Sequence, residues 1–397
     1  MYKTIQNTRQ LISRVFIILL ILPLFSCSSE DPTGSNNSDY HYTQPLETTD
    51  EWQTASLNSV GIDDALIENI AQDINDNQFP EVHSVVIIKD NQLVFEEYWR
   101  GHDFGFASPN YLGGYLNFDM NTRHNTHSAT KSFTSAVVGL AIDHGFINSE
   151  DDNIFDYLPE YYDQWNNEGR ENITIKHCLM MASGLEWNEW DVGVTADDAD
   201  LMIFNRYSDP VRFLMLKPIV TEPGSSFYYN GGTVDLLGVL VANATGQSVK
   251  DFSRDHLFAP LGITNYNWQT LQPSGITCCH GDIYITPRDM AKFGQLFLDD
   301  GQWNGEQIIS PGWIQQSTQF HISPEVGWAD GYGYLWWLRN FQVNGVTHES
   351  FKAMGWGGQE IFVFKELEMV IVFTGANYTT GVPCDFIVEE YILPAVQ

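Results

Sequence analysis

A serine and a lysine at a spacing suited to nucleophilic catalysis, Ser128 and Lys131, lie directly before an apolar run with helical periodicity that Gly145 closes. Residues three apart share one face of a helix, so the Lys131 amine is expected one turn from the Ser128 hydroxyl. The unpaired N–H groups at a helix start also favour negative charge near Ser128. The pattern therefore predicts an activated serine nucleophile. The alternative is a capping serine followed by a surface lysine, because the S-x-x-K spacing alone is common.

A tyrosine and an asparagine, Tyr228 and Asn230, form a second polar pair between a Pro-Gly turn and a helical pattern over residues 234–244. A phenol has an unperturbed pKa of about 10, which a cation such as Lys131 lowers toward the range of a working base. We therefore expect Tyr228 to shuttle protons and Asn230 to form hydrogen bonds beside it. The spacing to Asn230 selects Tyr228 over Tyr229. The alternative is a pair of core aromatic residues followed by a turn asparagine.

A glycine-rich segment over residues 353–359 leads into a β-prone run. Its glycines, among them Gly355 and Gly357, allow a substrate to approach the backbone closely. We expect the backbone N–H of Trp356 to join that of Ser128 in an oxyanion hole, which stabilises the charge of a tetrahedral intermediate. The alternative is a β-bulge or a turn.

Helices and strands at both ends of the chain enclose a mostly helical middle over residues 126–300. This order predicts an α/β fold of the α+β kind: an antiparallel sheet flanked by N- and C-terminal helices, plus a mostly helical second lobe. The catalytic segments are expected where the two lobes meet. The expected outer elements are a helix over 62–74, strands over 85–88 and 93–98 around an Asp90-Asn91 turn, strands over 360–364 and 369–373, and a closing helix over 385–393.

The composition excludes several classes of function. The 397 residues include 51 acidic and 19 basic side chains, and the formal charge of −32 would repel phosphate backbones, so no nucleic-acid partner is expected. Apart from Cys27 there are four cysteines, too few for a disulfide scaffold in a domain of this size. The Cys278-Cys279-His280 run lacks the spacing of zinc ligands, so we expect no metal.

The N-terminus has the features of an export signal. Basic residues precede an apolar run over residues 15–25, which is too short to span a membrane well but suits the core of a signal peptide. The run ends at Leu-Phe-Ser-Cys, which resembles the lipobox of bacterial lipoproteins, so Cys27 is the expected lipidation site. The alternative is an ordinary secretory leader with an incidental cysteine.

This interpretation divides the chain into three parts. Residues 1–26 are expected to form the signal peptide, residues 27–50 a flexible tether rich in Ser, Asn, Asp and Thr, and residues 51–397 the catalytic domain. The mature protein would be a membrane-anchored lipoprotein that faces the periplasm or the cell surface. Its lipid anchor would be its sole contact with the membrane.

The order of these motifs resembles that of the serine β-lactamase and penicillin-binding-protein superfamily. It is most similar to the branch that contains class C β-lactamases, D-amino-acid peptidases, family VIII-type esterases and 6-aminohexanoate-dimer hydrolases. Residues 173–185 also resemble a loop common in that branch, and the similarity extends over residues 55–395. The resemblance implies a two-lobed fold, a covalent acyl-enzyme and no metal or organic cofactor.

The resemblance also implies roles for individual residues. Ser128 corresponds to the nucleophile, Lys131 to its activator, and Tyr228 to the general base and leaving-group acid. Asn230 corresponds to a hydrogen-bond partner of the substrate or of Lys131.

One motif departs from the pattern of the β-lactamases and peptidases. Where they carry K-T-G or H-x-G, this chain has Ala353-Met354-Gly355. The missing cation helps to recognise a substrate carboxylate, so its absence argues against an efficient β-lactamase or cell-wall carboxypeptidase. The A-x-G-x-G-G-Q form is similar to the dimer-hydrolase and esterase members.

We therefore expect a serine hydrolase that cleaves an ester or amide of a small molecule, with esters slightly favoured. One alternative is a peptidoglycan D,D-peptidase or β-lactamase, which a fluorescent penicillin would label. Another is a surface-tethered binding lipoprotein without turnover, which the intact set of Ser128, Lys131 and Tyr228 disfavours.

Overall fold

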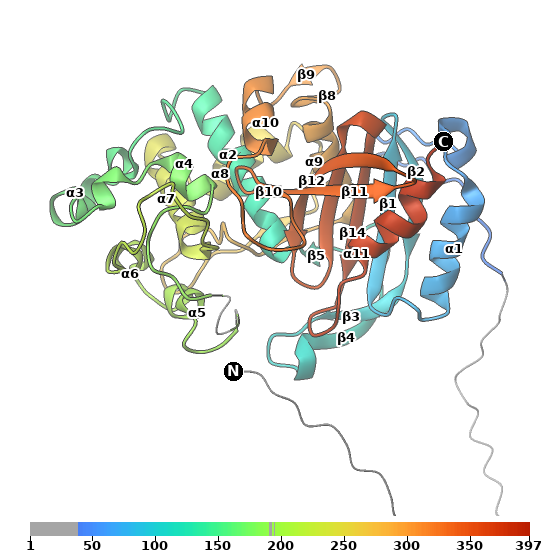
Figure 1. Cartoon of the computed structure of the whole chain (residues 1–397), viewed down its shortest axis with the longest axis horizontal. Helices are drawn as coiled ribbons and strands as arrows, with labels where there is room; N and C mark the ends of the chain where they lie inside the picture. Colours follow the sequence, from blue (N-terminus) through green and yellow to red (C-terminus); the bar gives the residue numbers. More distant parts are fainter. Residues whose placement is uncertain (1–38, 190–192, 194) are drawn as a thin grey trace, which may run out of the picture. The chain divides into compact units, whose positions relative to one another are not determined.

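The computed structural model describes residues 39–189, 193 and 195–397, and residues 40–397 form one compact unit. Its centre is a seven-stranded sheet in the order β10-β11-β12-β13-β14-β1-β2, in which all neighbouring strands are antiparallel (Figure 1). The strands are β1 (Val82–Lys89), β2 (Gln92–Tyr98), β10 (Gly331–Tyr332), β11 (Trp337–Val343), β12 (Val346–Gly355), β13 (Gln359–Phe364) and β14 (Met369–Gly375). The two ends of the chain meet within the sheet, where Val85 of β1 lies opposite Phe373 of β14.

Both predicted hairpins are confirmed. Asp90 and Asn91 join β1 to β2 with φ values of 51° and 60°, the left-handed geometry that matches the twist of a two-residue hairpin. Glu368, with φ 47°, ends the turn between β13 and β14. Short polar side chains tolerate this region of φ best, which is why the Asp-Asn pair signalled the first turn in the sequence.

Helices from opposite ends of the chain cover one face of the sheet, on the right in Figure 1. They are α1 (Asp64–Asn75), α11 (Cys384–Ile387), η8 (Val388–Ile392) and α12 (Leu393–Ala395), and they confirm the predicted opening and closing helices. The other face packs against α9 (Pro287–Leu298), whose Phe293 stacks on Phe133 of α2 (Thr130–Asp143) with ring centroids 3.7 Å apart. These contacts join the sheet to the helical lobe.

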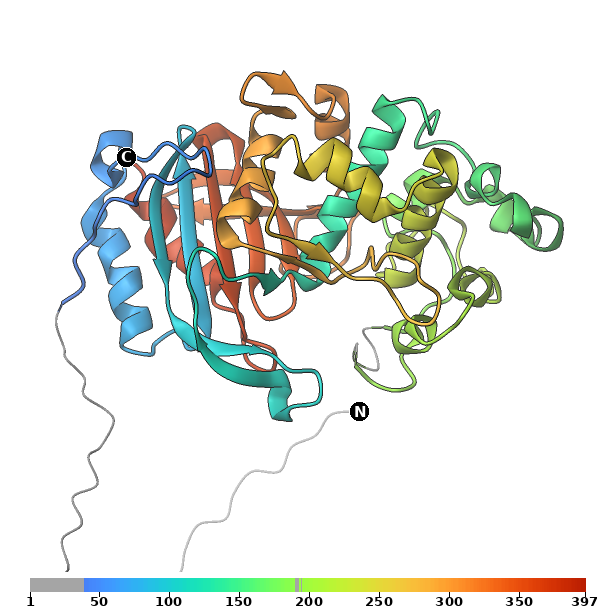
Figure 2. The same cartoon turned by 180° about the vertical axis from the view of Figure 1, so that it is seen from behind.

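The second lobe is mostly helical, as predicted (Figure 2). Its helices, besides α2, are α3 (Pro159–Trp165), α4 (Ile175–Leu179), α5 (Asp200–Asn205), α6 (Pro210–Met215), α7 (Gly231–Thr245), α8 (Val249–Ser253) and α10 (Pro311–Thr318). Short strands complete the fold: β3 (Arg100–Phe104) with β4 (Leu112–Asn117), β5 (His124–Asn125) with β7 (Ile283–Ile285) and β6 (Asn267–Trp268), and β8 (Gln302–Trp303) with β9 (Glu306–Gln307).

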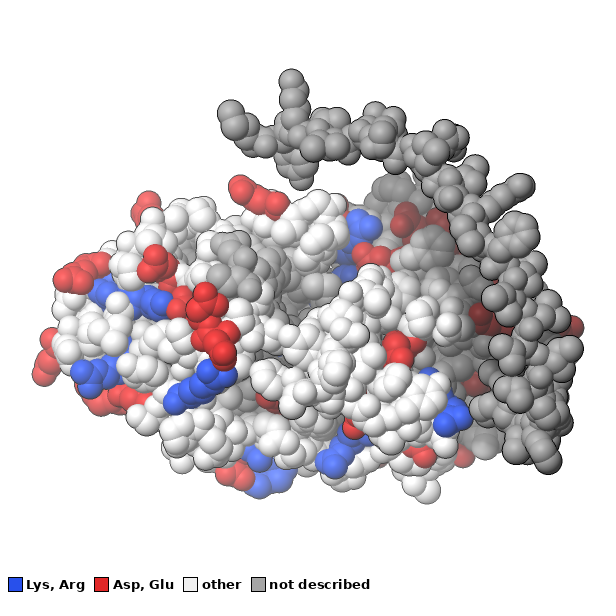
Figure 3. Space-filling model, turned by 90° about the horizontal axis from the view of Figure 1, so that it is seen from below, with Lys and Arg blue, Asp and Glu red and all other residues white. Residues whose placement is uncertain are grey.

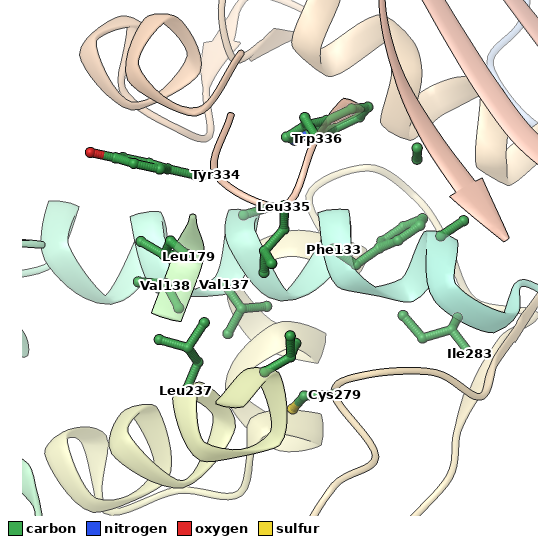
Figure 4. Packing of buried hydrophobic residues seen from close by; sticks show 14 of the residues in the cluster. Phe133, Val137, Val138, Leu179, Leu237, Cys279, Ile283, Tyr334, Leu335 and Trp336 are labelled. Carbon is green, nitrogen blue, oxygen red and sulfur yellow. The ribbon is translucent and has the colours of Figure 1, made fainter. Parts of the chain in front are cut away.

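Helix α2 is buried on every side from Thr130 to Ala141. Figure 4 shows this helix between Leu335 on one side and Leu237 of α7, next to Val137, on the other. A helix that is buried on all sides belongs in the interior of a protein. The nucleophile motif therefore begins a helix that the rest of the fold holds in place.

The domain begins earlier than predicted. Residues up to Asp50 were expected to belong to a flexible tether, but Tyr40 donates a hydrogen bond to Glu97 (2.5 Å) and Asp50 forms an ion pair with the buried Arg288 (2.8 Å). These contacts place residues 40–50 on the domain. Cys27 and the predicted signal peptide lie outside the described residues. No helix of the described part of the chain is long and apolar enough to cross a membrane.

The acidic side chains, which give the chain its formal charge of −32, do not form a single patch on the face seen in Figure 3. There, acidic and basic side chains are interspersed toward the left, and a broad uncharged area lies across the middle. Interspersed charges keep a surface soluble without creating a docking site for a polyelectrolyte.

Candidate active site

Ser128 lies in a short turn of 3₁₀ helix, η3 (His127–Ala129), that leads directly into α2. Thr126, at the start of this turn, donates its backbone N–H to the Ile283 carbonyl (2.8 Å). The residue before the nucleophile, His127, has φ 45°, which is unusual for a residue with a side chain and costs on the order of 1–3 kcal/mol. Such local strain persists where the surrounding structure fixes the chain, and here it orients the serine.

The predicted pairing of Ser128 and Lys131 is present in the structure. The Lys131 Nζ donates to Ser128 Oγ at 3.0 Å and to the backbone carbonyl of His280 at 2.6 Å. The lysine is 2% exposed, so its amine acts on the serine hydroxyl largely without competition from water. The amine and the hydroxyl are close enough to exchange a proton directly.

The tyrosine whose ring the structure places against Lys131 is Tyr229. The Lys131 Nζ lies 4.9 Å from the centroid of the Tyr229 ring, which is 8% exposed and lines the same cavity as Ser128. Tyr228, the residue selected from the sequence, is 46% exposed and is not among the residues that line the cavity.

The loop that carries the two tyrosines is fixed by the segment over residues 180–185. The Tyr228 N–H donates to the Met181 carbonyl (2.6 Å), and the Gly224 N–H donates to the Ala182 carbonyl (2.7 Å). Asn230 then begins helix α7: its Oδ1 accepts from the Thr233 N–H at 3.0 Å. Asn230 is buried, and the structure shows its Oδ1 as the cap of this helix.

The end of strand β12 presses against the nucleophile turn. A Cβ on Gly355 would lie 2.0 Å from the Thr126 carbonyl oxygen, so only glycine allows this approach. The next residue, Trp356, lines the cavity together with Ser128, and its indole N–H donates to the Tyr378 carbonyl (2.8 Å). Gly357, with φ 85°, turns the chain toward β13. The structure thus brings Gly355, Trp356 and Gly357 beside Ser128 in the wall of one cavity.

These segments enclose a cavity of about 540 Å³, a volume in the range typical of small-molecule sites. Much of its wall is apolar: Phe104, Phe106, Leu201, Met202, Met354, Trp356 and Val382. Phe106 and Val382 are exposed. Polar side chains lie along the rest of the wall, namely Ser128, Tyr229, Glu189, His280 and Asp282 among others.

Several polar groups of this wall were not identified from the sequence. Glu189 is buried, and its Oε2 accepts from the Trp187 indole N–H and the Gly231 backbone N–H, both at 2.8 Å. His280 Nδ1 lies 2.7 Å from Asp235 Oδ2. Gly231 is 42 positions from Glu189 and Asp235 is 45 positions from His280, so no local spacing signals these two pairs.

His127, next to the nucleophile, is held in its neutral form. Burial lowers the pKa of His127 to about 4, and the nearby Lys131 ammonium acts in the same direction, whereas the Asp282 carboxylate opposes both. A neutral imidazole adds no positive charge beside Ser128 and leaves Lys131 as the cation nearest the hydroxyl.

Among the described residues, Asp235, Cys278 and His280 could be considered as metal ligands, because their ligand atoms lie within 4.8 Å of one another. Their geometry favours hydrogen bonding instead. The Cys278 sulfur is 3.6 Å from both ring nitrogens of His280, so it does not lie along the lone pair of either. Burial also raises the pKa of the Cys278 thiol well above its usual value, which opposes the thiolate that zinc binds.

The structure has an antiparallel sheet flanked by terminal helices, and a serine–lysine pair at the start of a buried helix between two lobes. These features define the class of proteins with the β-lactamase and penicillin-binding-protein fold. Residues 66–385 match the family model described as Beta-lactamase, and the chain belongs to this family. The predicted family and fold are thereby confirmed.

The chain is similar to proteins with different activities. It is 23% identical over 265 residues to the 6-aminohexanoate-dimer hydrolase of Paenarthrobacter ureafaciens, covering 64% of this chain and 66% of that protein. It is 31% identical to Protein flp of Staphylococcus aureus over 140 residues, which are 35% of this chain and 27% of Protein flp. The chain thus spans about a quarter of the length of that relative.

Two solved structures share the fold. A family VIII carboxylesterase superposes with a TM-score of 0.64 at 17% identity, covering 83% of this chain and 96% of its own. A penicillin-binding protein from Bacillus halodurans superposes with a TM-score of 0.59 at 18% identity, covering 77% of this chain and 95% of its own.

Proposed function

We propose that the protein is a serine hydrolase that cleaves an ester or amide bond through a covalent acyl-enzyme on Ser128. The observation that carries the proposal is the 3.0 Å contact between the buried Lys131 amine and the Ser128 hydroxyl, at the wall of a cavity large enough for a small molecule. With Lys131 in its neutral amine form, Ser128 Oγ attacks the carbonyl carbon while its proton passes to Lys131. The leaving group then departs with that proton, which leaves Lys131 neutral again, and water releases the acyl group.

Tyr229 is the proposed proton relay between Ser128 and the leaving group. Its ring lies against the Lys131 ammonium and lines the cavity. In this proposal the Tyr229 hydroxyl passes the proton that Lys131 receives from Ser128 on to the departing oxygen or nitrogen. The role that the sequence resemblance gave to Tyr228 is thereby reassigned to its neighbour.

The backbone N–H groups of Ser128 and Trp356 are the proposed oxyanion hole. Both residues line the cavity, and the close approach of Gly355 to Thr126 holds the end of β12 beside the nucleophile turn. Removal of one oxyanion donor in other serine hydrolases costs on the order of 10²–10³ in kcat, so the fixed position of these two amides matters for turnover.

The proposed substrate is an uncharged small-molecule ester, with amides as a second choice. Ala353 occupies the position at which β-lactamases and peptidases carry a cation, and it is buried. The adjacent Lys352 is paired with Glu360 (2.8 Å) and Asp385 (2.5 Å), so its charge is compensated. Because the wall is largely apolar and β12 offers no free cation in the described structure, a substrate carboxylate would be desolvated without a partner. This disfavours D,D-peptidase and β-lactamase activity.

We also propose that the protein is an exported lipoprotein anchored through Cys27, with no nucleic-acid partner. The lipobox-like Leu-Phe-Ser-Cys sequence supports the anchor, and the charge of −32 argues against nucleic acid. Radiolabelled palmitate should be incorporated into the full chain and not into a Cys27→Ala variant. If the Cys27→Ala variant still incorporates label, Cys27 is not the lipidation site.

The hydrolase proposal is tested by incubating residues 40–397, which form one compact unit, with a fluorophosphonate probe and with a p-nitrophenyl ester. Wild-type protein should be labelled and should turn over the ester, and Ser128→Ala should do neither. Turnover that survives in Ser128→Ala would overturn the proposal. Absence of both signals in the wild type would favour a binding protein, and labelling by a fluorescent penicillin would favour the D,D-peptidase or β-lactamase alternative.

A further inference from the structure

The loop that supplies the Lys131 acceptor also presents a histidine to the cavity. The His280 carbonyl accepts from Lys131 Nζ at 2.6 Å, and the His280 side chain lines the same cavity as Ser128. The imidazole is therefore attached to the peptide group that helps to position the catalytic amine. None of the acylation steps described above uses this side chain.

Asp235 holds His280 at two points. Its Oδ1 accepts from the His280 backbone N–H at 2.9 Å, and its Oδ2 lies 2.7 Å from the ring Nδ1. Asp235 is fully buried in the first turns of α7, the helix that the Tyr229 loop enters. A buried carboxylate needs such partners, and here it fixes both the backbone and the ring of one residue.

This contact determines which ring nitrogen carries the proton. A carboxylate accepts hydrogen bonds, so Nδ1 bears the hydrogen and Nε2 keeps its lone pair. The same arrangement of carboxylate and imidazole prepares histidine as a general base in other serine hydrolases. The groups that face the ring are Asp235 from α7, Lys131 from α2, and Cys278 and Asp282 from its own segment.

Resting on the acyl-enzyme proposed above, we propose that the Asp235–His280 pair activates the water molecule that releases the acyl group from Ser128. Water gives a proton to Nε2 as its oxygen bonds to the acyl carbon. The bond from that carbon to Ser128 Oγ then breaks, and the His280 imidazolium returns the proton to Oγ through cavity water and the Lys131 amine, which lies 3.0 Å from Oγ. Lys131 ends as the neutral amine with which deacylation began, so one water is consumed and one carboxylic acid is formed.

The pKa of His280 is consistent with a general base that Asp235 supports. Burial by itself lowers it, but the charge and the hydrogen bond of Asp235 outweigh burial, and the pKa is raised above its usual value. Asp235 thus stabilises the imidazolium that forms when water is deprotonated. Turnover should consequently decline as the pH falls through the raised pKa of His280, because the protonated ring cannot accept a proton.

The test separates acylation from deacylation. In rapid mixing with a p-nitrophenyl ester, His280→Gln should retain a burst of about one equivalent of p-nitrophenol, while the steady-state rate falls roughly a hundredfold or more, as expected for loss of a general base. The acyl adduct on Ser128 should persist in intact-mass spectra. Hydroxylamine, a nucleophile that needs no base, should restore turnover. The exposed His144→Gln is the matched control and should behave as the wild type.

Two results would overturn the proposal: equal losses in the burst rate and the steady-state rate of His280→Gln, or no loss in either. Asp235→Asn provides a second variant, with the same predicted accumulation of acyl-enzyme, in case His280→Gln does not fold. Failure of the underlying acyl-enzyme proposal would look different, because the wild type itself would then show no adduct on Ser128.

Discussion

The Lys131 ammonium faces the ring of Tyr229, with Nζ 4.9 Å from the ring centroid and 3.0 Å from Ser128 Oγ. Ser128 comes from η3, Lys131 from the start of α2, and Tyr229 from the loop before α7, 98 positions after Lys131 (229 − 131). This convergence brings one amine close to both a serine hydroxyl and a tyrosine ring.

The first prediction follows from that convergence. Tyr229→Phe should lower kcat/KM for a p-nitrophenyl ester by roughly a hundredfold or more, because a proton relay is removed. Tyr228→Phe removes the same atom from a half-exposed side chain outside the cavity lining and should change kcat/KM less than about threefold. A larger loss of kcat/KM in Tyr228→Phe than in Tyr229→Phe would identify Tyr228 as the proton relay.

A second prediction concerns the contact between β12 and the nucleophile turn. Gly355→Ala should destabilise the protein by about 1–3 kcal/mol, because the new Cβ would lie 2.0 Å from the Thr126 carbonyl oxygen and force the two segments apart. Ester turnover should fall as well, since the same shift moves Trp356 away from Ser128. Urea unfolding and steady-state kinetics measure the two effects.

The control for Gly355→Ala is Gly312→Ala in helix α10. Nothing lies within 4 Å of the Cβ it would add, so the change should be neutral or slightly stabilising, as alanine is a better helix former than glycine. A Gly355→Ala protein as stable and as active as this control would refute the packing argument.

A third prediction concerns acid stability. Burial lowers the pKa of His124 to about 3, with the neighbouring His83 acting in the same direction. In the unfolded chain the ring regains its ordinary pKa of about 6.5, so the unfolded state takes up the proton first and stability declines as the pH falls below that value. Between about pH 7 and pH 5, His124 should account for a loss of roughly 1–2 kcal/mol.

Urea unfolding at several pH values measures this loss. His124→Phe should weaken the pH dependence between pH 7 and pH 5, because its ring can keep the stacking that His124 makes with Phe118, whose centroid is 4.7 Å away, and cannot bind a proton. The exposed His144→Gln should leave the dependence unchanged. An identical slope in His124→Phe and wild type would show that His124 is not responsible.

A fourth prediction concerns the charge of the substrate. p-Nitrophenyl butyrate should be hydrolysed at least about tenfold better than mono-p-nitrophenyl succinate, which differs by a carboxylate. A desolvated, unpaired charge costs more than 1.4 kcal/mol, the equivalent of that factor. Glu189 and Asp282 in the cavity wall would add repulsion. A preference for the succinate would mean that the cavity supplies a cation. It would then support D,D-peptidase or β-lactamase activity instead.

The sequence determined the elements and the Ser128–Lys131 pair because these depend on interactions between near neighbours. Helical periodicity predicted α1, the Asp90-Asn91 pair predicted the first hairpin turn, and the three-residue spacing predicted that Lys131 meets Ser128. The order of the motifs was also sufficient to identify the family, because each is a short local pattern.

Only the tertiary structure decided what depends on groups distant in the chain. Which of two adjacent tyrosines faces Lys131 is set by the loops that hold their segment, whereas the spacing to Asn230 favoured Tyr228. The pairing of His280 with Asp235, 45 positions away (280 − 235), depends on how α7 packs beside the loop that carries His280. The sequence thus specified the side chains and their local geometry. The packing of the two lobes determines which side chains meet. Residues remote in sequence come together only when a shared core fixes the positions of both.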